Sequence, residues 1–305
     1  MLKNLLLVAL AFAASAAHAV INFGVDNNGN VTDPGSGVPF NAVAQIYSNN
    51  QNDPRGTGVY LGNGYVLTAR HVDINLGSGQ VRFDRGGQLY DIDPNFTPTQ
   101  VAPNVDLDII RIIGDPGIPG VNLLSSPTEI LDTATVTIVG WGRGRDPNDP
   151  VGTFQVSWGN IAATNDKRWG LNVLRGVEDD FDGRGSFVYD ALYTILGAPG
   201  AGGVGANEAA VATLDSGGGL FQQINGDWYL VGIATEVADY AADTSSFFND
   251  SPEPITFPPG GENYFVRVSS YAGDILAIIP EPSATPLIFG ALGLLLLTRR
   301  RARRV

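Results

Sequence analysis

Cysteine is absent from this chain of 305 residues, which excludes disulfide bonds and thiolate metal sites. Basic residues are also scarce: 18 Lys and Arg stand against 31 Asp and Glu, a formal net charge of −13. This excess of acid argues against nucleic acid as a partner, because phosphate binding needs a basic surface. The turn at 26–30 lacks the terminal Glu of a calcium loop, so a solvated turn is favoured. We therefore predict no metal and no cofactor.

The first 19 residues have the pattern of a secretory signal peptide. Lys3 provides the positive start, residues 5–12 form an apolar stretch, and residues 17–19 (Ala-His-Ala) have the small-x-small form that signal peptidase cleaves. A buried N-terminal helix is the alternative, but the apolar stretch is short for one. We predict export with residues 1–19 removed, which would expose Val20; a further propeptide that ends before Pro39 is the alternative start.

The last 26 residues have a different pattern, a Pro-Glu-Pro motif at 280–282, an apolar run at 287–297 and an arginine-rich tail. In this order the three parts resemble a PEP-CTERM sorting signal, which implies processing by an exosortase at the inner membrane. An ordinary tail anchor is the alternative, although the run is shorter than the ~20 residues of a stable span. The positive-inside rule would keep the arginines cytoplasmic and the body outside. We predict a membrane contact through residues 280–305 only, and delivery to the cell surface or the extracellular space.

The body between these ends, 20–279, has the pattern of an antiparallel β protein. Six basic residues and Glu281 lie in the end segments, which leaves 12 basic and 30 acidic residues, a net charge of −18, in the body. Asn-Gly pairs at 63–64 and 225–226 each separate two strand candidates and predict hairpins. Only 269–279 is predicted as a helix, with Ser270 as its N-cap. The strand candidates are 41–47, 58–61, 65–68, 81–84, 107–113, 134–139, 154–158, 187–196, 221–224 and 228–234.

Three short blocks contain the residue types of nucleophilic catalysis. His71, the one histidine left after removal of residues 1–19, follows a hairpin strand. Asp106 leads into an apolar strand, where a carboxylate can orient an imidazole and stabilise its cation. Ser216 precedes three glycines, which allow a sharp turn whose N–H groups converge on an oxyanion. Taken singly, each block also fits an exposed histidine, a capped strand start or a plain glycine-rich loop.

Together the blocks at 67–72, 106–112 and 214–220 resemble the trypsin/chymotrypsin-like serine proteases. That family has Leu-Thr-Ala-Ala-His, Asp-Ile-Ala-Leu-Leu and Gly-Asp-Ser-Gly-Gly blocks in the same order. Further similar segments lie at 56–61, 139–142 (Val-Gly-Trp-Gly), 228–233 and 264–271, so the resemblance spans about 40–279. It implies an all-β fold of two antiparallel six-stranded Greek-key barrels, about 40–130 and 131–268, followed by a short C-terminal helix at about 269–279.

The resemblance also assigns roles to individual residues. His71 matches the general base, Asp106 the carboxylate that orients it, and Ser216 the nucleophile; Asp108 is the competitor of Asp106. The backbone N–H groups of Leu214 and Ser216 match the oxyanion hole. Leu214 replaces the usual Gly, and a Leu resists a positive φ. Asp215 matches the partner of a newly formed N-terminal ammonium.

The specificity pocket departs from the family pattern. Ala210, six residues before the serine, matches the pocket base, and without an acid there a preference for Arg or Lys is disfavoured. Thr235, Glu236 and Val237 replace the family's Ser-Trp-Gly wall. The predicted function is an exported serine endopeptidase that acts on peptides or proteins, with signal peptidase and exosortase as processing enzymes. The alternative is a catalytically inactive protease fold that serves in surface or matrix interactions.

Overall fold

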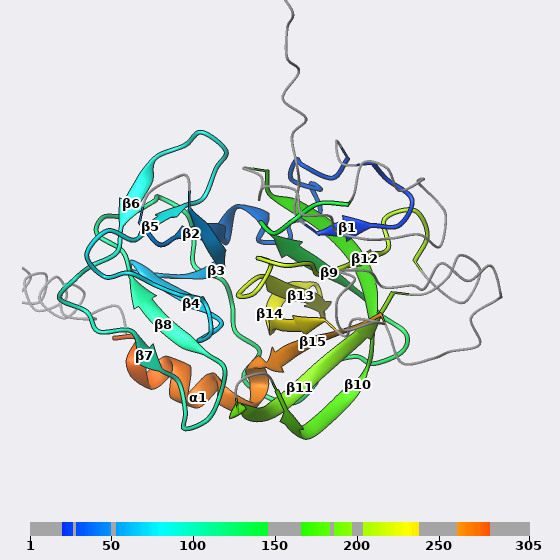
Figure 1. The fold of residues 1–305 in the computed structure, drawn as a ribbon. Helices are drawn as coiled ribbons and strands as arrows, with labels where there is room; N and C mark the ends of the chain where they lie inside the picture. Colours follow the sequence, from blue (N-terminus) through cyan, green and yellow to red (C-terminus); the bar gives the residue numbers. More distant parts are fainter. Residues whose placement is uncertain are drawn as a thin grey trace, which may run out of the picture.

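The computed structural model describes residues 20–26, 29–49, 53–145, 166–183, 186–196, 204–237 and 261–280. Two β units lie side by side, and one helix near the end of the described chain lies below the first unit in the view of Figure 1. The predicted strand at 154–158, the signal peptide and most of the sorting segment lie outside the described residues. Within the described ranges, no helix is both long and apolar enough to cross a membrane.

The first unit is an antiparallel sheet of seven strands with the order β6-β5-β2-β3-β4-β8-β7. Asn63 and Gly64 turn the β3–β4 hairpin with φ values of 53° and 85°, so the predicted Asn-Gly turn is confirmed. Its elements are η1 (Phe40–Ala42), β2 (Val43–Tyr47), β3 (Pro54–Gly62), β4 (Tyr65–Thr68), β5 (Gln80–Arg82), β6 (Leu89–Asp91), β7 (Thr99–Gln100) and β8 (Asp108–Arg111).

The second unit is a closed antiparallel barrel with the order β10-β11-β15-β14-β13-β9. The predicted hairpin at Asn225-Gly226 is confirmed, with φ values of 54° and 96°. The short strands β1 (Ile21–Asn22) and β12 (Ala209–Ala210) pair beside it. The other elements are β9 (Thr135–Gly140), β10 (Arg168–Asp182), β11 (Val188–Ile195), β13 (Gly219–Ile224), β14 (Asp227–Val237), β15 (Glu262–Arg267) and α1 (Val268–Ile278).

The all-β class with a short C-terminal helix is confirmed, but two details differ from the prediction. The first sheet does not close by a regular ladder: the single bridge Ile92↔Ile112 joins the residue after β6 to the residue after β8, and no ladder joins the edge strands β6 and β7. The predicted N-cap, Ser270, is wrong. Arg267 occupies the N-cap position without a side-chain capping hydrogen bond, and the Ser269 hydroxyl donates to Glu129, which Arg267 also contacts.

One of the apolar clusters spans both units, and each unit also has a cluster of its own. A single buried cluster includes Val43 and Leu67 from the first sheet and Val139, Trp141 and Phe221 from the second. Trp141 donates its indole N–H to the Val43 carbonyl oxygen at 3.1 Å. This packing brings the end of β4 and the start of β13 to the same junction between the units.

Candidate active site

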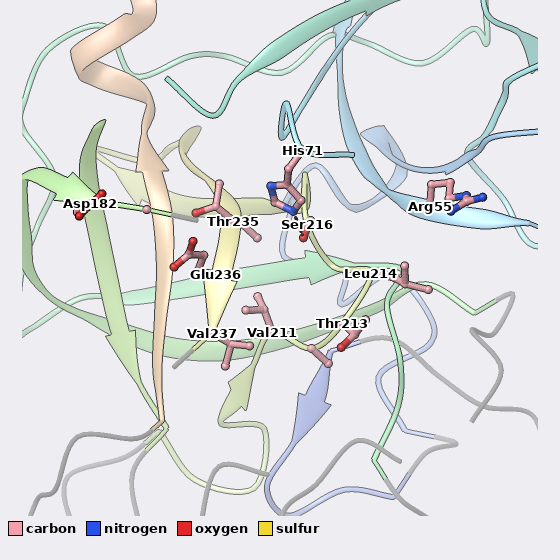
Figure 2. Close-up of a pocket in the computed structure, with 13 residues that line it drawn as sticks. Arg55, His71, Asp182, Val211, Thr213, Leu214, Ser216, Thr235, Glu236 and Val237 are labelled. Carbon is pink, nitrogen blue, oxygen red and sulfur yellow. Dashed lines mark hydrogen bonds between the residues drawn. The ribbon is translucent and has the colours of Figure 1, made fainter. Parts of the chain in front are cut away.

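His71, Asp106 and Ser216 come together at the junction of the two units. His71 Nδ1 lies 2.7 Å from Asp106 Oδ2, and His71 Nε2 lies 2.8 Å from Ser216 Oγ. The His71 backbone N–H also donates to Asp106 Oδ1 at 3.0 Å. His71 follows β4, Asp106 precedes β8 and Ser216 precedes β13, so loops at the ends of three strands bring the groups together (Figure 2 shows His71 and Ser216).

The buried carboxylate of Asp106 determines which ring nitrogen of His71 carries the proton. The Asp106 side chain is 1% exposed and that of His71 is 20% exposed, so the carboxylate is sealed behind the ring. An ionised carboxylate only accepts hydrogen bonds, which places the imidazole proton on Nδ1. Nε2 then carries a lone pair directed at the Ser216 hydroxyl. This tautomer lets the ring remove a proton from the serine.

Asp108, the competing carboxylate, has a different partner. Arg70 Nη1 donates to Asp108 Oδ1 at 2.6 Å. Burial raises the pKa of Asp108, and the Arg70 contact opposes that rise. Asp108 is the first residue of β8 and pairs with Thr68 across the ladder, whereas Asp106 lies before the strand and faces the imidazole. The structure therefore brings Asp106 and not Asp108 to His71.

The turn after Ser216 depends on Gly217. Its φ is +88°, and a Cβ atom there would lie 1.9 Å from the Thr57 carbonyl oxygen, so only glycine fits. Thr57 anchors the turn from the first unit: its N–H donates to the Ser216 oxygen at 2.8 Å and its Oγ1 to the Leu214 oxygen at 3.0 Å. These contacts fix the serine relative to the strand that leads into the histidine hairpin.

Leu214 adopts the conformation that the sequence made doubtful, with φ +75°. The Thr213 carbonyl accepts a hydrogen bond from the Arg143 N–H at 2.8 Å. In a trans peptide the C=O and the following N–H point in opposite directions, so the Leu214 N–H points away from Arg143. Within the described part of the chain, no hydrogen bond uses the N–H of Leu214 or of Ser216. Both donors are thus free to bind an oxyanion, at the expense of about 1–2 kcal/mol of backbone strain.

We expect this strain to be measurable by comparing Leu214→Gly with Leu214→Ala. Both variants lose the Leu side chain, but only Gly removes the Cβ that opposes φ +75°. After the larger backbone entropy of Gly is subtracted, the Gly variant should be about 0.5–1 kcal/mol more stable. Urea unfolding in a Ser216→Ala background, which prevents self-digestion, measures this. A Gly variant less stable than the Ala variant would contradict the strained conformation.

A cavity of about 560 Å³ opens beside Ser216. Thr235, Glu236 and Val237, which the resemblance assigns to the pocket wall, lie in its lining. Ala210 is not in the lining and instead pairs with Ile21 at 0% exposure, because β12 uses Ala209 and Ala210 for its ladder with β1. The full lining, drawn in Figure 2, is Arg55, His71, Asp182, Gly183, Val211, Ala212, Thr213, Leu214, Ser216, Ala234, Thr235, Glu236 and Val237.

Val211 lines the cavity and Ala210 does not, and two charged residues of the lining, Arg55 and Asp182, were not predicted. Arg55 lies early in β3, and Asp182 is the last residue of β10. Neither lies in one of the three sequence blocks. Only the folding of distant strand ends around the serine reveals them, so no local signal could have found them.

Asp215 lies beneath the serine turn and accepts three N–H groups. Ala212 and Gly142 donate at 2.9 and 2.7 Å, and the Val20 nitrogen donates at 3.2 Å. The side chain fits because a Cβ on Gly140 would come within 2.0 Å of its oxygen. Burial raises the pKa of Asp215 to about 7, although these hydrogen bonds oppose the rise.

Comparison with known proteins supports the same class of fold. The Trypsin family profile matches residues 26–181, just over half of the chain, so the chain belongs to the trypsin family of serine proteases. His71 and Asp106 lie within the match and Ser216 lies beyond it. A search of curated proteins found no match. Among the described residues, no group of three His, Asp or Glu side chains could hold a metal ion.

Solved structures are similar at low identity. A crystal structure of the Rv3671c protease in an inactive form is 19% identical, over 79% of this chain and 91% of that chain, with a TM-score of 0.45. An inactive form of Rv3671c from M. tuberculosis H37Rv is 18% identical, over 81% and 91%, with a TM-score of 0.48. The HtrA-type protease AlgW with a decapeptide is 16% identical, over 78% and 64%, with a TM-score of 0.49.

Proposed function

We propose that this protein is an active, exported serine endopeptidase. The observation that supports it most is the hydrogen-bonded series Asp106–His71–Ser216, with 2.7 and 2.8 Å between successive heavy atoms. A serine hydroxyl is a weak nucleophile until a neighbouring base takes its proton, and this arrangement provides the base. The trypsin-like fold implies peptide or protein substrates.

The geometry supports an acyl-enzyme mechanism in two halves. Ser216 Oγ attacks the scissile carbonyl carbon while its proton moves to His71 Nε2, and the oxyanion accepts from the N–H groups of Leu214 and Ser216. Asp106 stabilises the imidazolium. His71 then gives the proton to the leaving amine as the C–N bond breaks. In the second half, water attacks the ester, its proton moves to His71, and the acid product leaves as Ser216 regains its hydrogen.

Labelling with a fluorophosphonate tests this proposal. The reagent forms a bond only with an activated serine, so the purified body 20–279 should be labelled at Ser216 alone. Denatured protein provides the background control. The alternative of an inactive protease fold is favoured by one observation, the non-glycine residue Leu214 at the oxyanion hole. Absence of labelling in folded protein would decide for that alternative.

We also propose that residues 1–19 direct export and that their removal activates the enzyme. Val20 and Ile21 are fully buried, Ile21 pairs with Ala210, and the Val20 nitrogen already contacts Asp215. In the uncut chain that nitrogen belongs to a neutral amide. Signal peptidase cleavage after Ala19 would turn it into an ammonium next to a buried carboxylate, without further movement of the chain.

Delivery to the cell surface completes the proposal and rests on the Pro-Glu-Pro, apolar and arginine segments at 280–305. An exosortase would cleave near 280–282 and release the enzyme from the inner membrane. We expect the intact mass of the exported protein to lack the apolar run and the arginine tail. A species that keeps Arg304 and stays with the inner membrane would instead mean a tail-anchored periplasmic protease.

A further inference from the structure

The cavity beside Ser216 has an apolar part and an acidic part. Val211, Ala212 and Val237 provide apolar lining, whereas Asp182 and Glu236 provide two carboxylates. In Figure 2, Val211 and Val237 lie below Ser216, and Glu236 and Asp182 lie toward the left of the view. A substrate that fills this cavity therefore meets two chemically different surfaces.

Arg55, the arginine of the lining, lies apart from the two carboxylates. It lies across Ser216 from them in Figure 2, and its guanidinium donates to Asp53 at 3.0 Å. The rest of the protein adds to the negative electrostatic potential of these carboxylates, since residues 20–279 have a net charge of −18. Such a potential attracts cationic peptides and raises their local concentration.

The end of β14 shows how a peptide would lie. One edge of this segment pairs with β15, through Glu236↔Tyr264 and Val237↔Asn263. The ladder with β13 stops at Ile233, and within the described residues no strand pairs with the other edge of 235–237. An extended peptide can add to such an edge through main-chain hydrogen bonds.

The direction of that peptide follows from the barrel. Ala234 is hydrogen-bonded to Gly217 and Gly218 beside the serine, so β14 runs away from Ser216 as it proceeds to Val237. Every ladder of this barrel is antiparallel. A peptide added in the same way runs toward Ser216, and the residues before its scissile bond lie along 235–237.

Strand alternation then assigns the two surfaces to two substrate residues. Successive side chains of a strand point to opposite faces, so Val237 and Glu236 face different substrate residues. The residue whose carbonyl is attacked meets Val211 and Val237. The residue before it points to the other face, toward Glu236 and Asp182.

We propose that Glu236, assisted by Asp182, is a specificity-determining residue that selects Lys or Arg at the second residue before the scissile bond, with a small or medium apolar residue at the first. This inference rests on the proposed peptidase function and extends it to a substrate class. The acidic recognition is assigned to Glu236 and Asp182, while the part that meets the attacked residue is apolar.

Three internally quenched peptides test the inference. They share Val at the first residue before the scissile bond and differ only in Lys, Gln or Glu at the second. For the unmodified enzyme we expect kcat/KM to be about tenfold higher for Lys than for Gln, and lowest for Glu, because a charged hydrogen bond is made only with Lys. The Lys:Gln ratio should fall with added salt.

Glu236→Gln should bring the Lys:Gln ratio close to 1, and Glu236→Lys should make the Glu peptide the preferred one. Glu178→Gln is the matched control: it removes the same charge from an exposed position of β10 outside the cavity lining, and should keep the ratio. Fluorophosphonate labelling of each variant shows that its serine site is formed.

The outcomes separate the two proposals. If the labelled, unmodified enzyme cleaves all three peptides equally, the specificity inference is rejected and the peptidase function stands. If Glu178→Gln lowers the Lys:Gln ratio as much as Glu236→Gln does, the preference comes from the overall charge of the protein. That result would also reject the specificity inference. If Ser216 is not labelled, the peptidase function fails and the specificity inference fails with it.

Discussion

Replacing Ser216 with alanine should abolish peptide hydrolysis, with a fall of about 10⁶-fold in kcat. The reason is that Ser216 Oγ, 2.8 Å from His71 Nε2, is the atom that would form the acyl bond; the oxyanion donors of the backbone remain and leave weak residual catalysis. Steady-state cleavage of a fluorogenic peptide measures the loss. Thermal unfolding should show an intact fold, because the substitution removes one oxygen from a partly exposed side chain.

Two comparisons make that result specific. Ser126→Ala changes an exposed serine outside the cavity lining and should keep full activity. The double variant Ser216→Ala/His71→Ala should be no slower than Ser216→Ala alone, because the two side chains act as one unit. Hydrolysis by Ser216→Ala at the rate of the unmodified enzyme would reject Ser216 as the nucleophile.

The second large effect concerns the free N-terminus. A protein that starts at Val20 should be at least 10²-fold more active than the same protein with one additional residue before Val20. Burial raises the pKa of Asp215 to about 7 while its partner at Val20 is a neutral amide. An ammonium at that place stabilises the charged carboxylate, which lies beneath the turn that carries both oxyanion donors. The loss of one such donor is worth about 10²–10³ in kcat.

Asp215→Asn provides the control for this effect. The Gly142 and Ala212 N–H groups and the Val20 nitrogen would face an amide in place of a carboxylate, so the variant should have low activity. In that background the additional N-terminal residue should change the activity no further, because its partner charge is already gone. Equal activity of the two N-terminal forms of the unmodified chain would exclude activation by cleavage after Ala19.

The contact between Asp215 and the Val20 nitrogen should also affect how the free energy of unfolding depends on pH. Because the folded-state pKa of Asp215 in the uncut chain is raised above its unfolded value, that chain loses stability as the pH rises from about 4 to 7. The form that starts at Val20 should lose less over this range, since the ammonium lowers the folded-state pKa. Urea unfolding at several pH values compares the two forms.

Local features of the chain were predictable because their causes are local. Asn-Gly pairs tolerate positive φ at both turn positions, so both hairpins could be predicted from two residues each. The longest strand, β10, was not predicted, because Gly170, Gly176 and the acidic residues after 177 interrupt its apolar alternation. Its main-chain pairing with β9 and β11 establishes it as a strand although its own residue pattern does not predict one.

The sequence by itself determined the all-β class, the two hairpins and the three blocks that contain His71, Asp106 and Ser216. Only the tertiary structure decided that Asp106 faces the imidazole while Asp108 pairs with Arg70, that Leu214 holds a positive φ, and that Val211 lines the cavity in place of Ala210. The first set depends on turn propensity and on the types of residues that lie next to one another in the sequence. The second depends on ladder register and on contacts between residues far apart in sequence, where a shift of one residue turns a side chain to the opposite face.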